Sequence, residues 1–97
     1  MRKIEKFVKL LIEILDEVEK EKVNPDSLWH SSLLDNVVVP EISQLLKFAK
    51  NGVVYFKYGK KQRRLESTYF ILDSMAPLDS VLLGQKILKL QQLYRKL

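Results

Sequence analysis

The chain of 97 residues has no cysteine, one histidine and only three glycines and three prolines. The absence of cysteine excludes disulfides and thiolate metal sites and fits a reducing compartment. The first residues lack the uncharged apolar run of a signal peptide, because Glu5, Lys6 and Lys9 interrupt it. No run approaches the roughly 18–20 apolar residues of a membrane span. We therefore expect one cytoplasmic domain over residues 1–97, with no membrane partner.

Residues suited to catalysis or to metal and cofactor binding are also scarce. His30 has no second histidine and no cysteine with which to share a metal ion. A catalytic set with Ser31 and Asp35 would require the three side chains to meet in space. Gly52 and Gly59 match neither of the glycine-rich patterns that bind phosphates. We expect no enzyme, no cofactor and no metal site.

Acidic residues are absent from residues 50–64, KNGVVYFKYGKKQRR, a stretch that carries six basic residues. The net charge is −1 over residues 1–26, −1 over 27–49 and +1 over 65–97, so this stretch creates the surplus of +5. Its valines and aromatic residues can anchor it on a core. A basic cluster with such an anchor is typical of an anion-binding element, with phosphate first among its ligands. The alternatives are a solvated turn, in which lysines prevent edge pairing, and a site for an acidic protein.

Apolar periodicity predicts several helices. Over residues 2–22 the spacing is 3, 4, 3, 4, through Ile4, Phe7, Leu11, Ile14 and Val18. A breaker at residues 24–27 precedes a short helix over 27–36. Pro40 predicts a turn after the valines at 37–39 and opens a helix over 40–50. Asn51-Gly52 ends that helix in the left-handed manner. The last helix covers residues 78–97.

The stretch between the last two helices is ambiguous. β-branched and aromatic residues between two glycines favour a hairpin, with strands at 53–58 and 64–72. The opposing interpretation is a helix, because a 3.6-residue period also fits Leu65, Tyr69, Leu72 and Met75. We expect a mainly α fold with one β-hairpin, winged-helix-like and of the α+β class. The alternative is an all-α bundle of four or five helices.

The C-terminal helix carries an apolar seam spaced 4, 3, 4, 3, formed by Leu83, Ile87, Leu90, Tyr94 and Leu97. The seam either packs within one monomer or joins two copies in a two-fold dimer. Gly84, near the start of this helix, indicates a close approach by another helix.

The order of these elements resembles that of the winged helix-turn-helix DNA-binding proteins. In this resemblance NGVVYFKYGKKQRRLESTYFIL looks like the helix end, strand, tip and strand of a wing, although no family motif specifies it. It implies that residues 40–50 enter the major groove while the wing contacts the DNA backbone. The implied DNA-binding residues are Ser43, Gln44, Lys47, Lys50, Lys57, Lys60, Lys61, Arg63 and Arg64. Glu41 departs from the pattern, because an acid near phosphates weakens binding.

Two functions follow. The first is a small double-stranded DNA-binding transcription regulator that holds phosphates with a basic hairpin. The alternative is an all-helical protein-interaction module without DNA binding, such as a small regulator, an adaptor or a bacteriocin-immunity-type protein. In this alternative Leu65, Tyr69, Leu72 and Met75 are core, and exposed aromatics among residues 53–58 contact the partner. RNA is a third, weaker possibility, since YGKKQRR has fewer arginines than arginine-rich RNA-binding segments.

Overall fold

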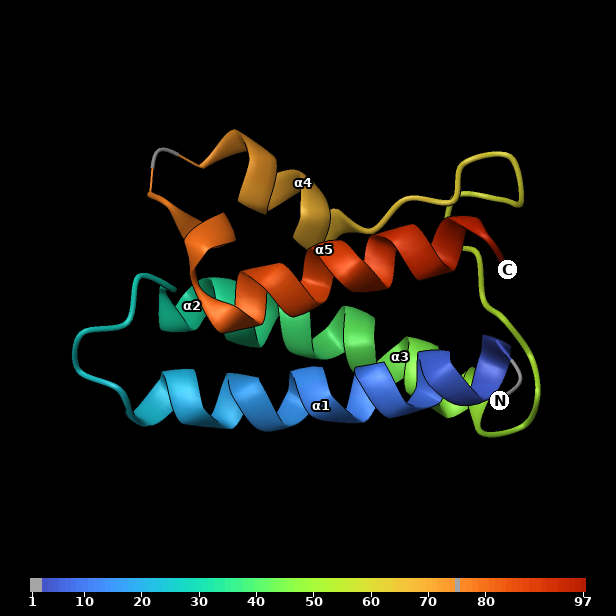
Figure 1. Cartoon of the computed structure of the whole chain (residues 1–97), viewed down its shortest axis with the longest axis horizontal. Coiled ribbons are helices and arrows are strands. Elements are labelled where there is room, and N and C mark those ends of the chain that lie inside the picture. Colours follow the sequence, from blue (N-terminus) through green and yellow to red (C-terminus); the bar gives the residue numbers. More distant parts are fainter. Residues whose placement is uncertain (1–2, 75) are drawn as a thin grey trace.

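Three long helices run along the longest dimension of the molecule (Figure 1). Helix α1 spans Lys3–Val23, α3 spans Val39–Ala49 and α5 spans Leu82–Arg95. The computed structural model describes residues 3–74 and 76–97, with extents of 37 × 23 × 22 Å. α1 packs against both α3 and α5, because one apolar stripe of each helix faces the common core. The helix predicted over residues 2–22 agrees with α1, while residue 2 lies outside the described part.

Residues 53–72, all of them described, contain no strand, so the predicted hairpin and the α+β fold class are wrong. Residues 50–65 form an irregular loop, and helix α4 follows over Glu66–Asp73. The aromatic side chains that suggested strands pack on helices instead. The rings of Phe48 and Tyr55 stack 5.0 Å apart, and Phe56 lies 5.2 Å from the ring of Tyr94. The fold is therefore the all-α alternative.

Helix α4 buries a different face from the one that its sequence period indicates. Tyr69 is 55% exposed and Leu72 is 74% exposed, so neither belongs to the core. Ile71 and Thr68 are buried instead, together with Leu65 just before the helix. Met75, the last residue of the proposed period, lies outside the described residues. Of the residues expected in the core, only Leu65 is confirmed as buried. Helix α4 is short and packs on the bundle with one narrow side, so most of its apolar residues stay outside the core.

Pro40 does not separate two helices as predicted. Helix α2 (Ser31–Leu33), the π-helical turn η1 (Leu34–Val38) and α3 follow one another without a break. In a regular α-helix Pro40 would crowd the carbonyl four residues earlier and leave it without a donor. The wider turn relieves this conflict, since the Val39 N–H donates to the carbonyl of Leu34, five residues back. The turn of a helix-turn-helix is thus absent from residues 31–49.

The C-terminal helix begins later than predicted, after a 3-10 turn, η2, at Leu78–Ser80. Gly84 lies against this turn. A Cβ atom at Gly84 would sit 1.9 Å from the carbonyl oxygen of Leu78, which no side chain permits. The expected close approach therefore exists, but it is made by η2 and not by another helix.

The seam of α5 lies in the core of the monomer. Leu83, Ile87 and Leu90 are fully buried, Tyr94 is 1% exposed, and Leu97 is half-buried. The ring of Tyr94 stacks on Phe7 of α1 at 5.8 Å. Of the two interpretations of this seam, the intramolecular one describes these contacts, and the predicted dimer seam is not available on the surface.

Candidate functional site

The basic loop, residues 50–65, lies at the end of the bundle where α1 begins and α5 ends (Figure 1). It starts at the left-handed ending of α3 that the sequence predicted, since Gly52 has a φ of +75°. The Gly52 N–H donates to the carbonyl of Ala49, and the Val53 N–H donates to that of Phe48. This pair of bonds is a Schellman motif, which turns the chain away from α3 and into the loop.

Two side chains of α5 hold the backbone of the loop. The Tyr94 hydroxyl donates to the carbonyl of Tyr55 at 2.6 Å, and burial raises the pKa of Tyr94 to about 12. The Gln91 amide donates to the carbonyl of Arg63 at 2.7 Å and accepts from the Leu65 N–H at 2.8 Å. Because Gln91 and Tyr94 are themselves buried, the loop has a fixed path without any strand pairing.

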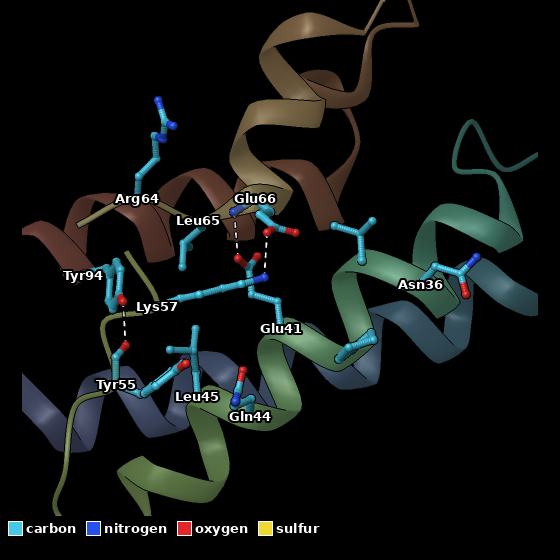
Figure 2. Close-up of a pocket in the computed structure, with 12 residues that line it drawn as sticks. Asn36, Glu41, Gln44, Leu45, Tyr55, Lys57, Arg64, Leu65, Glu66 and Tyr94 are labelled. Carbon is cyan, nitrogen blue, oxygen red and sulfur yellow. Dashed lines mark hydrogen bonds and ion pairs between the residues drawn. The ribbon is translucent and has the colours of Figure 1, made fainter. Parts of the chain in front are cut away.

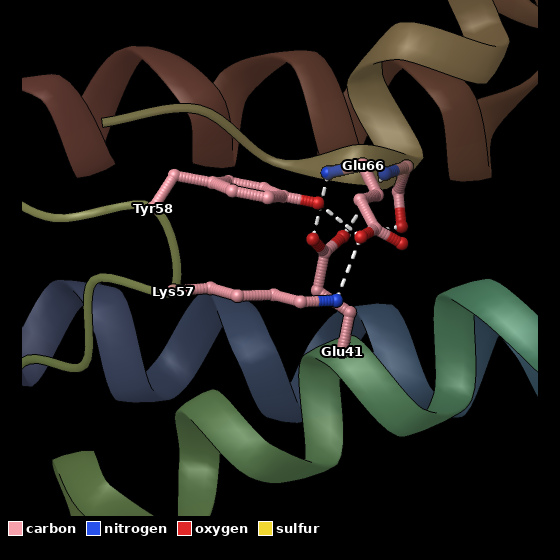
Figure 3. A network of polar contacts seen from close by, with 5 residues as sticks. Glu41, Lys57, Tyr58 and Glu66 are labelled. Carbon is pink, nitrogen blue, oxygen red and sulfur yellow. Dashed lines mark hydrogen bonds and ion pairs between the residues drawn. The ribbon is translucent and has the colours of Figure 1, made fainter. Parts of the chain in front are cut away.

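Glu41 of α3 caps helix α4 from outside (Figures 2 and 3). One carboxylate oxygen accepts from the Glu66 N–H at 2.7 Å. The other accepts from the N–H and the hydroxyl of Ser67, at 3.0 and 2.7 Å. These are the unpaired donors of a helix N-terminus, where negative charge is favoured. No local feature of the sequence indicates this role, because Leu65 precedes α4 where a capping residue normally stands.

A second carboxylate, Glu66, ties down the middle of the loop (Figure 3). The Lys57 ammonium lies 2.6 Å from a Glu66 carboxylate oxygen, and the Tyr58 hydroxyl donates to the same oxygen. The Lys57 ammonium, and after it the Tyr58 hydroxyl, hold the pKa of Glu66 below its usual value. The same bond raises the pKa of Lys57. Lys57, a predicted DNA-binding residue, is therefore engaged within the molecule.

Arg63 is also engaged within the molecule. Its guanidinium carbon lies 5.0 Å from the centre of the Phe56 ring. Its N–H groups donate to the carbonyls of Lys60 and Arg95, at 3.1 and 3.2 Å. A cation at the C-terminal end of a helix such as α5 is favoured by the helix dipole. Arg63 thus joins the loop to α5.

Four cations of the loop gather with one from α5. Lys60, Lys61, Arg63, Arg64 and Arg95 line an open pocket of about 510 Å³ with Gln62, and no acid lines it. No described residue forms an ion pair with Lys60, Lys61, Arg64 or Arg95. Uncompensated cations at one place create a positive potential that attracts anionic groups.

The other predicted DNA-binding residues are dispersed. Gln44, Lys57 and Arg64 line a pocket of about 100 Å³, but Glu41 and Glu66 lie among them (Figure 2). Ser43 and Lys47 are exposed on α3, outside both of these pockets. Lys50 lines a different groove, bordered by α1.

Four residues form an exposed surface that we call the aromatic–arginine patch: Tyr58, Arg64, Tyr69 and Phe70. Tyr58 is one of the aromatics among residues 53–58 that the all-helical alternative expects at a partner, whereas Tyr69 and Phe70 were not expected on the surface. With Glu66 the four residues of the patch line an open pocket of about 310 Å³. The three aromatic side chains are between 39% and 55% exposed, and the rings of Tyr69 and Phe70 meet edge to face at 6.1 Å. In the all-helical alternative the sequence period places Tyr69 in the core, but the structure exposes this face of α4.

Charge is separated along the length of the molecule. The segments towards the loop end, residues 3–12, 44–65 and 86–97, contain fourteen basic residues and one acidic residue. The segments towards the other end, residues 13–43, 66–74 and 76–85, contain two basic and eleven acidic residues. The net charge of +5 therefore conceals a strongly basic end and an acidic end, which would orient the molecule in the field of a charged partner.

Comparisons with protein-family models, curated proteins and solved structures gave no match to this chain. Within residues 3–74 and 76–97, no helix combines the length and apolar character needed to cross a membrane. The cytoplasmic compartment expected from the sequence stays a prediction. Over the same residues, no three histidine, aspartate or glutamate side chains gather where they could hold a metal ion.

Proposed function

We propose that this chain is an all-helical protein-interaction module that binds an acidic protein where the basic loop meets helix α4. The observation that carries the proposal is the aromatic–arginine patch. Tyrosine and arginine dominate the energetic centres of protein interfaces, because they bury large areas and also offer hydrogen bonds. Lys60 and Lys61 border this region as exposed cations, where they would speed the encounter with an acidic surface.

The same contacts favour a protein over DNA. Glu41 and Glu66 line the same pocket as Gln44 and Arg64, so two carboxylates would face the phosphates of a duplex laid across this pocket. Lys57 is neutralised by its ion pair, and the predicted wing is not formed. A protein surface can place a donor opposite each carboxylate, whereas a phosphate backbone cannot. Binding to DNA or RNA remains an untested prediction.

Quantitative affinity capture tests the proposal. The native protein and a Tyr69→Ala/Arg64→Ala variant are immobilised and exposed at physiological salt to lysate of the cells that make the protein. Bound proteins are compared by isotope-labelled mass spectrometry. We expect an acidic protein that the native chain retains and the variant loses. Leu72→Ala serves as the matched control, because Leu72 is an exposed residue of α4 that does not line the patch.

Titration with the purified partner then measures how much each substitution weakens binding. Loss of a central aromatic residue such as Tyr69 is expected to cost about 2 kcal/mol, which is roughly a thirtyfold rise in Kd. Equal retention of every protein by the native chain and the double variant would contradict the proposal. A gel-shift titration with double-stranded DNA at several salt concentrations runs in parallel. Salt-dependent DNA binding that Lys60→Ala weakens and Tyr69→Ala does not would instead favour a DNA-binding regulator.

A further inference from the structure

The open pocket of about 510 Å³ at the tip of the basic loop brings five cations together, and we call them the cation cluster: Lys60, Lys61, Arg63, Arg64 and Arg95. None of the described residues that line this pocket is acidic. Like charges that lie so close together repel one another. An anion that binds among them relieves this repulsion, so the pocket favours a ligand with more than one negative charge.

Hydrogen bonds within the loop hold the cation cluster in place. The Gln62 N–H donates to the carbonyl of Gly59 at 3.1 Å, which makes Lys60 and Lys61 the two central residues of a turn. Both lysines are exposed. The Arg63 guanidinium joins this turn to the end of α5 through two further hydrogen bonds. Because the backbone already has its path, a ligand that binds here has little of the loop to order.

The number and type of these cations favour a phosphate monoester over a single carboxylate. A phosphorylated side chain carries a charge of about −1.5 to −2 at pH 7 and offers three acceptor oxygens, whereas a carboxylate offers two oxygens and a single charge. A guanidinium pairs with phosphate through two parallel hydrogen bonds, and an ammonium contributes a compact charge. Arg64 and Arg95 are exposed guanidinium groups beside the two lysines, so one phosphate group can bind to several of these cations at once.

Arg64 connects the cation cluster to the aromatic–arginine patch, because it lines both pockets. A protein segment that lies on the aromatic residues of the patch is therefore next to the cluster. The long row of phosphates in a duplex would instead also meet Glu41 and Glu66, which line a third pocket with Arg64. This continuity indicates that the phosphate belongs to the protein that covers the patch.

We propose that the cation cluster binds a phosphorylated side chain of the acidic protein partner. The inference rests on the proposed function, since it names the chemistry by which that partner contacts the loop. Phosphorylation then regulates the complex, because the modified partner contacts both the patch and the cluster, whereas the unmodified partner contacts the patch alone. Removal of the phosphate is expected to raise the Kd of the complex roughly tenfold.

Nuclear magnetic resonance titrations with two small probes test the site without any partner. One probe is N-acetyl-O-phosphoserine amide. The other is an acetylated and amidated dipeptide of two aspartates, which carries nearly the same charge. We expect the phosphate probe to shift the amide signals of residues 60–64 and to saturate, with a Kd roughly tenfold below that of the dipeptide. Equal binding of the two probes, or shifts spread over the whole chain, would overturn the proposal.

Two double variants with the same net charge locate the site. Lys60→Ala/Lys61→Ala removes two cations of the cluster and should raise the Kd of the phosphate probe about fivefold or more. Lys47→Ala/Lys50→Ala is the matched control, because these exposed lysines lie outside the pocket, and it should change the Kd by less than about twofold. If both variants weaken binding equally, net charge alone attracts the probe and the proposed site is wrong. Circular dichroism checks that both variants keep their helices.

Phosphatase treatment tests whether the phosphate comes from a protein. The lysate of the capture experiment is dialysed, which removes small phosphorylated molecules, and one half is then treated with a protein phosphatase. We expect the immobilised native chain to retain less of the acidic partner from the treated half. Equal retention from both halves would overturn the proposal and leave the proposed function intact. If the phosphate probe binds but the patch variant loses no protein, the proposed function fails, and the proposal of a phosphorylated partner fails with it.

Discussion

Replacing Glu41 by alanine should destabilise the whole molecule, although Glu41 is a partly exposed acid on a surface helix. The carboxylate accepts from two backbone N–H groups and one hydroxyl at the start of α4. In a winged-helix interpretation, the same residue would face DNA and its removal would strengthen binding without any effect on stability. The structure predicts the opposite result for stability.

The size of the loss in stability follows from the burial of Ser67. Ser67 is 0% exposed, so the Glu41→Ala change leaves its N–H and hydroxyl donors buried without an acceptor. An unsatisfied buried group costs about 1–3 kcal/mol, and loss of a negative charge at a helix N-terminus adds about 0.3–1 kcal/mol. We expect a loss of about 2–4 kcal/mol in the free energy of unfolding. For a domain of this size that lowers the melting temperature by roughly 10–20 °C.

Urea unfolding followed by circular dichroism measures the loss, and amide hydrogen exchange at Ser67 and Thr68 localises it. Glu41→Gln, which keeps one acceptor oxygen and loses the charge, should lie between the native protein and Glu41→Ala. The control is Glu19→Ala, because the Glu19 side chain is 73% exposed and lies 3.9 Å from its nearest cation. If Glu41→Ala proves as stable as Glu19→Ala, the proposed capping of α4 is wrong.

Three further predictions concern α5. Gly84→Ala should lower the free energy of unfolding by about 3 kcal/mol or more, because the new methyl group would meet the Leu78 carbonyl and the backbone would have to move. A melting temperature within a degree of the native value would contradict this. Gln91→Leu should lower the free energy of unfolding by about 2 kcal/mol, because the Leu65 N–H and the Arg63 carbonyl lose their hydrogen-bond partner. It should also speed proteolysis within the basic loop, and unchanged cleavage would refute the anchoring role of Gln91. Burial raises the pKa of Tyr94 to about 12, above the ordinary value of 10.0, so folding protects the neutral phenol and stability should fall as pH rises from about 10 towards 12. Ultraviolet titration should show this late-ionising phenol in the native protein, and Tyr94→Phe should remove it.

The sequence predicted most of the helices because their signals are local. The apolar period of α1 and the glycine that ends α3 depend on residues within a few positions of one another. The sequence also indicates the apolar seam of α5, but it does not tell which surface the seam packs against. A stripe of this kind looks the same whether it packs on another part of its own chain or on a second copy.

The failures have physical causes that lie outside the local sequence. Pro40 stays within a helix because η1 widens before it, and no residue type marks such a turn. Helix α4 starts without a capping residue of its own, since the cap comes from Glu41, twenty-five positions earlier. Among the β-branched and aromatic residues that favoured strands, Val54, Tyr55 and Phe56 pack against the helical core, and such packing requires the same composition as a half-buried strand. The face of α4 that forms part of the aromatic–arginine patch could not be recognised for a related reason. Helix α4 exposes three large apolar residues, Tyr69, Phe70 and Leu72, and buries only Ile71, so its apolar pattern does not mark its buried face.

The way in which the basic loop is fastened has a consequence for how this protein could diversify. Gln91 and Tyr94 form hydrogen bonds with main-chain atoms of the loop, and Glu41 accepts a hydrogen bond from the backbone where α4 begins. None of these hydrogen bonds depends on which side chains stand at positions 60–62. Those positions can accept new residues at little thermodynamic cost, so descendants of this chain could acquire different recognition properties while inheriting the same scaffold.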